Sequence, residues 1–265
     1  MTQTTDAQVQ VRTETWGDVP RHTVRFAADR VGSLLAWASE PVLFARVKLT
    51  MIADPAVRRP AIAQVTVDLN GRPLRAQAEG RIMHEAVDHA CDRLRTQLLR
   101  AARHWEAARG GRPVPTPGEW RHQSLPARRL PYYPRPTDER DIVRRKSYAL
   151  DRETPEEAAA EVELMDYHFH LFTERSTGQD SVICRSAGGY RLQLAVPQVD
   201  GLGLVDESIV VSEAAAPRLP LSETPAMLEA SGQPFLFFVD AETGRGDVIY
   251  HRYDGHYGLI VPFAG

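Results

Sequence analysis

Residues 61–80 read AIAQVTVDLNGRPLRAQAEG, and this stretch decides the fold of the N-terminal part of the chain. Apolar residues take every second position both before and after Asn70-Gly71, which is the period of a half-buried β-strand. An Asn-Gly pair between two such runs is the strongest short-range signal for a tight hairpin turn. The stretch therefore predicts two antiparallel strands that bury one face of a sheet and leave the other face polar.

The flanking sequence supplies the rest of a βαβββα domain, which we place at residues 1–109. Alternation marks residues 9–15 and 42–52 as strands, and Pro20 can open a helix at its first turn. The apolar side of the second of these strands is expected to hold Leu43, Ala45, Val47 and Leu49. Residues 82–108 predict a long helix with the inner stripe Met83, Val87, Ala90, Leu94, Leu98, Ala101 and Trp105. Because one face of such a sheet stays open, both helices are expected on the other face.

Charge and proline content divide the chain into three parts. Residues 1–110 hold 16 Lys and Arg against 12 Asp and Glu, residues 111–146 hold 9 against 4, and residues 147–265 hold 7 against 19. Seven prolines fall between Gly110 and Pro136, where they exclude a continuous helix or central strand. We therefore expect a stiff Pro/Arg-rich linker at residues 110–140. The charge asymmetry predicts an anionic partner, often nucleic acid, for the basic part.

After the linker the chain repeats itself. Thr154-Pro155 aligns with Thr224-Pro225, and Thr177-Gly178 aligns with Thr243-Gly244. Each copy predicts a short acidic helix, a strand, a Thr-Gly hairpin turn and two further strands. A unit of about 45 residues is small for an independent core, so each copy is expected to need a partner.

These patterns together predict an α+β protein. The N-terminal βαβββα domain, with two helices on one sheet face, is followed by two small repeats that each combine a helix with a three-stranded sheet. We place the first repeat at residues 141–197, a spacer at 198–216 and the second repeat at 217–265.

The composition is that of an ordinary globular protein, with 43% apolar and 25% charged residues. No apolar run approaches the ~20 residues that a membrane span needs, and the start of the chain lacks the layout of a signal peptide. Cys91 and Cys184 lie far apart and are expected to be reduced thiols. We therefore expect a cytoplasmic protein with no membrane contact.

The sequence predicts neither an enzyme site nor a bound metal or cofactor. It contains no P-loop, no dinucleotide-binding glycine motif, no nucleophile elbow and no Cys pair at zinc spacing. His168-Phe169-His170 lies on a predicted strand with no further ligand at a suitable spacing. Strand histidines that flank a buried Phe are therefore favoured over a metal site.

Several basic residues of the N-terminal domain fall on the open sheet face, among them Arg46, Lys48 and Arg75. Guanidinium groups suit phosphate because they are planar, bidentate and always charged. However, 30 of the 32 basic residues are Arg, and Asp68 and Glu79 share the same face. An ordinary solvated surface accounts for these residues no less well than RNA binding does. The composition therefore does not decide between the two interpretations.

Three motifs carry a resemblance to a known family. RIMHEAVDHACDRLRTQLLRAARHW (81–105) resembles the final helix of the ribosome hibernation promoting factor family, also called ribosomal subunit interface proteins. IVRRKSYALDRETPEEAAAEVELMDYHFHLF (142–172) looks like the start of the C-terminal domain of its long form, and DAETGRGDVIYHRYDGHYGLIVP (240–262) is similar to the end of that domain. The duplicated C-terminal part and the arginine richness also resemble the dormancy- or hypoxia-associated members of mycobacteria.

The resemblance implies a function without turnover. The N-terminal domain would bind 16S rRNA in the decoding region of the 30S subunit within the 70S ribosome, and would block the mRNA and tRNA positions. It implies no catalysis, no cofactor, no DNA and no small-molecule substrate. The residues expected to contact rRNA are Arg46, Lys48, Arg58, Arg59, Arg72, Arg75, Arg81, Arg93, Arg100 and Arg103.

The second C-terminal copy departs from the long-form pattern, in which one such domain pairs with its twin on another ribosome to give 100S dimers. Tethering two copies raises their effective concentration to the millimolar range, so we expect them to pair within the chain and to leave 70S particles single. The residues expected at this pairing interface are Phe169, Phe172, Val182, Tyr190, Phe235, Phe238, Val248, Tyr250 and Tyr257.

Two other functions fit the same sequence. A translational repressor that binds another structured RNA would keep the basic N-terminal domain but would not need 70S particles. An acidic protein–protein adaptor would act through residues 147–265 alone and would be indifferent to the loss of Arg100 and Arg103.

Overall fold

The structure is a computed structural model, and it describes residues 10–55, 57–108, 135–198, 201–203, 205–252 and 254–263. The chain forms two compact units, residues 1–114 with 163–166 and residues 115–162 with 167–265. Both units combine helices with β-sheet, so the predicted α+β class is confirmed. The predicted linker lies outside the described residues up to position 134.

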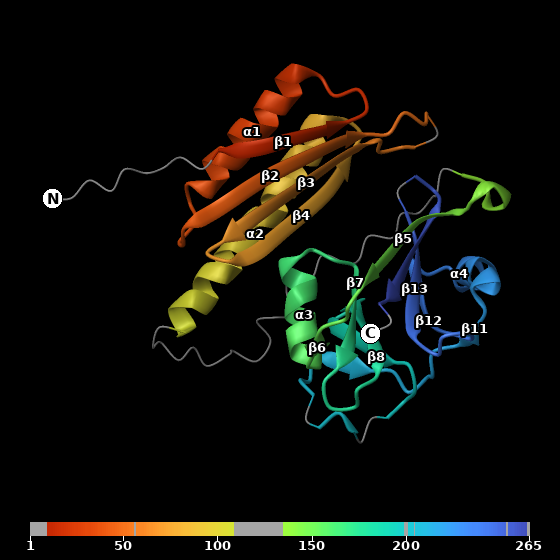
Figure 1. Cartoon of the computed structure of the whole chain (residues 1–265). Helices are drawn as coiled ribbons and strands as arrows, with labels where there is room; N and C mark the ends of the chain where they lie inside the picture. Colours follow the sequence, from red (N-terminus) through yellow and green to blue (C-terminus); the bar gives the residue numbers. More distant parts are fainter. Residues whose placement is uncertain are drawn as a thin grey trace. The chain divides into compact units, whose positions relative to one another are not determined.

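The first unit contains a four-stranded sheet in the order β1-β2-β3-β4. Strands β1 and β2 are parallel, and the other neighbouring strands are antiparallel. The elements are β1 (Val11–Trp16), α1 (Arg21–Leu35), β2 (Val42–Met51), β3 (Ala61–Leu69), β4 (Arg72–Gly80) and α2 (Met83–Ala108). This is the predicted βαβββα order, with both helices on one face of the sheet (Figure 1).

The hairpin between β3 and β4 has the geometry that Asn-Gly predicts. Asn70 and Gly71 have φ angles of 54° and 87°, which is the pair of positive values that a type I′ turn requires. The Gly71 N–H also donates a hydrogen bond of 2.7 Å to Asp68 Oδ1. This turn fixes the register of the two longest runs of alternating residues, because a two-residue loop allows one pairing only.

The core of the first unit lies between the sheet and its two helices. Ala45, Val47 and Leu49 of β2 are fully buried there, as predicted, together with the stripe of α2 from Met83 to Ala101. The prediction for Leu43 is wrong, since its side chain is 62% exposed. The pairing of β2 with β3 shifts register between Val42 and Phe44, and such a bulge breaks the alternation of faces. The side chain of Trp105 lies outside the described part of the structure.

The second unit contains two five-stranded sheets in the orders β10-β9-β8-β7-β6 and β11-β12-β13-β14-β5. The three predicted strands of each repeat form the centre. The short strands β6, β10 and β11 and the longer β5 extend the sides. The elements are β5 (Ile142–Tyr148), β6 (Arg152–Glu153), α3 (Pro155–Leu164), β7 (Phe169–Glu174), β8 (Asp180–Ser186), β9 (Gly189–Leu194), β10 (Ile209–Val211), β11 (Arg218–Leu219), α4 (Thr224–Ser231), β12 (Phe235–Asp240), β13 (Gly246–His251) and β14 (Tyr257–Pro262).

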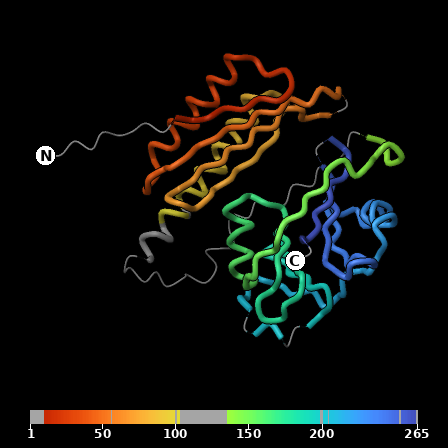
Figure 2. Tube along the Cα trace, viewed as in Figure 1, coloured from red at the N-terminus to blue at the C-terminus, as the bar shows by residue number. Residues whose placement is uncertain are grey.

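The outer strands of the two sheets are exchanged. Strand β5 lies at the start of the first repeat, before its helix, but pairs in parallel with β14, the last strand of the second repeat. Strand β10 precedes the second repeat but pairs in parallel with β9, the last strand of the first repeat. The light green β5 beside the blue strands of the C-terminus shows this arrangement (Figure 2). Each sheet is therefore completed by a segment that lies before the helix of the other repeat in the sequence.

Two leucines of α2 that differ in burial give a direct test of how this helix packs in the first unit. Leu94 is fully buried, whereas Leu99 on the same helix is 54% exposed. We expect Leu94→Ala to lower the free energy of unfolding by about 3 kcal/mol, because a cavity adds to the lost transfer energy. Leu99→Ala should lower it by less than about 1 kcal/mol.

Urea denaturation followed by far-UV circular dichroism measures this difference, since the two longest helices, α1 and α2, belong to the first unit. Equal losses in the two variants would contradict the packing described here.

Candidate functional site

The strand register places basic side chains in one row across the open face of the first sheet. Arg12 pairs with Arg46 between β1 and β2, Arg46 pairs with Thr66, and Thr66 pairs with Arg75. Side chains at paired positions point to the same face. Three of the four strands therefore contribute a guanidinium to the same row, and the helices cover the opposite face.

The next row on this face is mixed in charge. It holds Glu14, Lys48, Gln64 and Gln77 at paired positions. Lys48 is exposed, and Arg46 Nη1 lies 3.6 Å from Glu14 Oε1. Exposed ion pairs of this kind contribute little to stability, so Arg46 can exchange Glu14 for another anion at small energetic loss.

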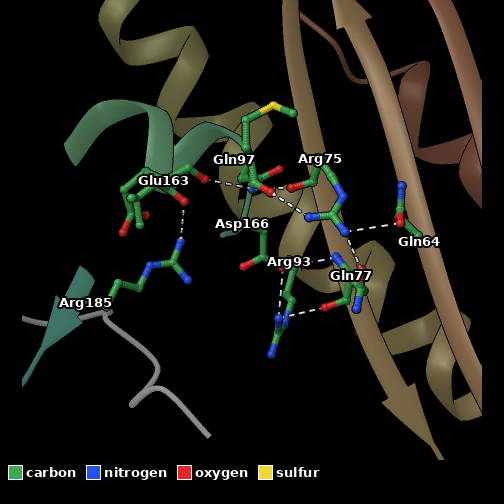
Figure 3. A network of polar contacts seen from close by, with 10 residues as sticks. Gln64, Arg75, Gln77, Arg93, Gln97, Glu163, Asp166 and Arg185 are labelled. Atoms are coloured by element: carbon green, nitrogen blue, oxygen red, sulfur yellow. Dashed lines mark hydrogen bonds and ion pairs between the residues drawn. The ribbon is translucent and has the colours of Figure 1, made fainter. Parts of the chain in front are cut away.

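A polar network in the first unit engages two further predicted residues, Arg75 and Arg93 (Figure 3). Arg75 donates to the main-chain oxygen of Met165 at 3.3 Å, to Gln64 Oε1 at 3.1 Å and to Gln77 Oε1. Arg93 Nη1 donates to Asp166 Oδ2 at 2.9 Å and to the main-chain oxygen of Gln77 at 2.7 Å.

The same network includes a buried amide that the sequence did not single out. Gln97 Nε2 donates to the main-chain oxygens of Arg75 at 2.7 Å and Glu163 at 3.0 Å. Asp166 also accepts a hydrogen bond of 3.0 Å from the Gln77 N–H. The segment 163–166 thus belongs to the first unit through its contacts, and it fixes the orientation of Arg75 and Arg93.

The remaining predicted rRNA contacts are spread around the sheet. Arg72 bonds to the buried carboxylate of Glu40, a residue that sequence reasoning missed because it lies in a loop. Arg59 lies 3.6 Å from Glu79, and Arg58 and Arg81 are exposed. Arg100 and Arg103 lie in α2, but their side chains fall outside the described part of the structure.

Residues of both repeats form one apolar cluster in the second unit. Phe169 and Phe235 have ring centroids 4.5 Å apart, and Phe169 and Tyr250 have centroids 5.8 Å apart. Val182 and Val248 belong to the same cluster and are almost fully buried. Five of the predicted pairing residues are thus brought together between the two sheets.

The other four predicted pairing residues lie in separate cores. Phe172 and Tyr190 are buried in the core of the first repeat, and Phe238 and Tyr257 in that of the second. Adjacent residues on a strand face opposite sides. Consecutive apolar pairs such as Leu171-Phe172 therefore bury one side chain between the sheets and the other inside the repeat.

A charged contact lies beside this apolar cluster. Arg245 Nε donates to Asp180 Oδ2 at 2.7 Å, and Arg245 Nη2 donates to Asp180 Oδ1 at 3.1 Å. The Gly246 N–H donates to Asp180 Oδ2 at 2.9 Å. Asp180 belongs to the first repeat and the other two residues to the second, so the contact links the two copies by a bidentate pair.

Burial also shifts the acidity of groups in the second unit. Desolvation, together with the charges of Asp240 and Asp180, raises the pKa of Asp247 to about 7, against the opposing effects of Arg245 and Arg145. Asp247 is almost fully buried. The folded protein therefore holds a proton on Asp247 between about pH 4 and pH 7, where the unfolded chain has released it.

This proton makes the stability of the second unit depend on pH. A folded-state pKa above the unfolded value means that stability is fully present at low pH and falls as the pH rises toward 7. Between pH 5 and pH 8 we expect a loss of about 2 kcal/mol, since one pKa unit corresponds to about 1.4 kcal/mol.

Calorimetric unfolding of the wild type and of Asp247→Asn across this range measures the effect. The difference in the free energy of unfolding between wild type and Asp247→Asn should shrink at low pH. A difference that stays constant with pH would rule out titration of Asp247 as its cause. The comparison also removes the opposite contribution of His251, whose pKa is lowered by burial in both proteins.

The cysteine and histidine residues have structural surroundings. Burial raises the pKa of the Cys91 thiol to about 11 and also raises the pKa of Cys184, which lowers their reactivity. His170 Nε2 lies 2.9 Å from Glu153 Oε2. Among the described residues, no group of three or more His, Cys, Asp or Glu side chains could hold a metal ion. Within that part of the chain, no helix has the length and apolar character needed to cross a membrane.

Comparison with known proteins places the chain in a class of ribosome-associated regulators. The family model described as "Sigma 54 modulation/S30EA ribosomal protein C terminus" matches the chain twice, at residues 137–192 and 207–259. Over 240 residues the chain is 35% identical to the "Dormancy associated translation inhibitor" of Mycobacterium tuberculosis (strain CDC 1551 / Oshkosh), which covers 82% of this chain and 76% of the relative. The protein of the same name from strain H37Rv matches equally well.

Two solved structures are similar to part of the chain. The N-terminal domain of Thermus thermophilus Protein Y has 22% identity and a TM-score of 0.29, covering 35% of this chain and 98% of that one. A ribosomal subunit interface protein from Coxiella burnetii has 20% identity and a TM-score of 0.27, covering 35% of this chain and 96% of that one.

The chain therefore belongs to the long-form ribosome hibernation promoting factor family, as its motifs indicated. Each of the two matched segments begins ahead of an exchanged strand, β5 or β10. The two outer strands are thus part of the repeated module, although the second lies in the segment that the sequence predicted as a spacer.

Proposed function

We propose that this protein is a ribosome hibernation factor whose N-terminal domain binds the decoding region of the 30S subunit in the cytoplasm. The observation that carries the proposal is the 35% identity over most of the chain to a relative named as a dormancy associated translation inhibitor. Bound there, the domain occludes the mRNA and tRNA positions, inhibits translation and stabilises the 70S ribosome under stress. The action is stoichiometric, with no turnover and no cofactor.

The open sheet face is the surface that meets 16S rRNA. Arg12 and Arg46 of the arginine row offer planar, permanently charged groups to phosphates, whereas the guanidinium of Arg75 already donates to Met165, Gln64 and Gln77. A rigid sheet that presents such a row recognises the shape and the backbone of folded RNA rather than its sequence. Exposed Lys48 lies in the next row of the same face, two residues after Arg46 on β2.

Charge reversal on this face tests the proposal. Lys48→Glu should weaken binding to 30S and 70S particles about tenfold or more at low salt, because a phosphate contact becomes a repulsion. Arg25→Glu makes the same charge change at an exposed position of α1, which packs on the other face of the sheet. Arg25→Glu should therefore bind nearly as the wild type does.

Co-sedimentation with purified 30S, 50S and 70S particles in sucrose gradients at two salt concentrations measures this binding. If both variants bind equally well, the open face is not the interface. If the wild type binds no particle, the proposed function fails and the acidic adaptor replaces it. Equal binding to isolated structured RNA would favour the translational repressor.

The two C-terminal repeats pair with each other within the chain. The shared apolar cluster, the exchanged strands and the Asp180–Arg245 contact support this part of the proposal. A short tether supplies the partner at an effective concentration in the millimolar range. The surface through which one repeat could join a second ribosome is therefore already occupied.

Self-pairing predicts the form of the inhibited ribosome. Increasing amounts of the protein added to 70S particles should leave the 70S peak in place and give no 100S peak in a sucrose gradient. A 100S peak that grows with protein concentration would keep the family assignment and overturn the intramolecular pairing.

A further inference from the structure

The two repeats differ at the positions that follow their shared Thr-Gly turn. Thr177-Gly178 is followed by Gln179 and Asp180, whereas Thr243-Gly244 is followed by Arg245 and Gly246. Both copies then continue with Val-Ile after one more residue. The copies agree at Thr-Gly before these positions and at Val-Ile after them, and the residue between, Ser181 or Asp247, also differs. The divergence is therefore local and lies within a common framework.

Equivalent residues of the two copies face each other in the second unit. Phe169 contacts its counterpart Phe235, and Asp180 contacts its counterpart Gly246. This is the property of a twofold axis, at which each residue meets its own equivalent. A pair of identical repeats would therefore place residue 180 against a second residue 180, or residue 246 against a second residue 246.

The backbone approach at this axis leaves no room for a side chain on the second repeat. A Cβ atom added to Gly246 would lie 2.7 Å from Asp180 Cβ and 2.8 Å from Phe237 Cε2. Both distances are shorter than any real Cβ contact. The Asp180 side chain therefore fits only opposite a glycine.

The charges at these positions favour the same pair as the steric fit does, namely a first repeat with a second repeat. Asp180 is 9% exposed, and its carboxylate accepts from the Arg245 guanidinium and from the Gly246 N–H. Two first repeats would oppose two such carboxylates with Gln179 in place of Arg245. Two second repeats would oppose two Arg245 side chains, each 37% exposed, and would lack the Asp180 carboxylate that accepts from Arg245 and Gly246. In a pair of first repeats the two nearly buried Asp180 carboxylates would be unpaired, and a buried unpaired charge is strongly destabilising.

We propose that Asp180, together with Arg245 and Gly246, is a specificity determinant that allows the first repeat to pair only with a second repeat. The inference rests on the proposed intramolecular pairing and explains how it is enforced. Like pairs between chains are rejected by a steric clash or an unpaired charge, and the tether then supplies the one permitted partner from the same chain. The partner that this surface fits is thus a copy with Arg-Gly after the turn.

Exchange of the two positions between the repeats tests this determinant in the full chain. Arg245→Gln with Gly246→Asp makes both repeats like the first, and Gln179→Arg with Asp180→Gly makes both like the second. The variant with all four substitutions restores an Arg opposite an Asp and a Gly, with the roles of the copies reversed. All three keep the apolar cluster and the N-terminal unit unchanged.

We expect each two-substitution variant to lower the calorimetric unfolding midpoint of the second unit by at least 5 °C. The four-substitution variant should recover more than half of that shift, because complementarity returns. A four-substitution variant no more stable than the two-substitution variants would overturn the proposal, as would two-substitution variants with a wild-type midpoint.

A mixing experiment measures specificity even if the variants lose their internal pairing. The first-like and the second-like variants offer each other complementary repeats, so their mixture should form a species of twice the chain mass in size-exclusion chromatography with light scattering. Neither variant alone should form it to the same extent. Absence of this species in the mixture would overturn the proposal, and the experiment uses no ribosomes, so its result is independent of where the N-terminal domain binds.

Discussion

Burial on both faces of the central strands is the constraint on which the second unit depends. In each repeat, one residue of a consecutive apolar pair fills the repeat's own core, and the other fills the cluster between the sheets. A single repeat has its helix to cover one face and nothing of its own to cover the other. Because a module of this size buries too little surface alone, the pairing of the copies is part of the fold itself.

The charge distribution assigns separate tasks to the two ends of the chain. The net positive charge lies in the N-terminal part and the linker, and residues 147–265 hold 19 acidic against 7 basic residues. Phosphate attracts the first sheet and repels the acidic repeats. Under the proposed function, rRNA would contact the first unit, and the acidic repeats would not compete with it for the same RNA surface.

Much of this fold could be predicted from local sequence signals. Alternation and Asn70-Gly71 predicted the first sheet, and the duplicated Thr-Pro and Thr-Gly motifs predicted the repeats. The sequence failed where pairing is non-local: β5 and β10 share too little sequence to reveal that they occupy equivalent places at the outer edges of opposite sheets. A bulge that exposes Leu43 also left no signal in the pattern.

For the candidate sites, too, local features were predictable from the sequence and features that depend on non-local pairing were not. The two-residue period of a strand predicted that Arg46, Lys48 and Arg75 share one face of the sheet. Their alignment into rows depends on which residues of neighbouring strands pair, and the sequence alone does not give that pairing. Asp180 and Arg245 belong to no binding-site motif or periodic pattern. Their only signal in the sequence is that the two copies differ directly after the shared Thr-Gly turn.

The exchanged strand β5 has a consequence for how the chain is made. Its pairing with β14 joins residues 115 positions apart, as the contact between Asp141 and His256 shows. During synthesis, β5 leaves the ribosome long before its partner strand exists, whereas every strand of the first unit finds its neighbours early. The N-terminal sheet can fold as it emerges, and the paired repeats must wait for the end of the chain, as contacts of such long range fold slowly. A nascent chain is therefore able to form its N-terminal domain before the acidic unit has taken shape.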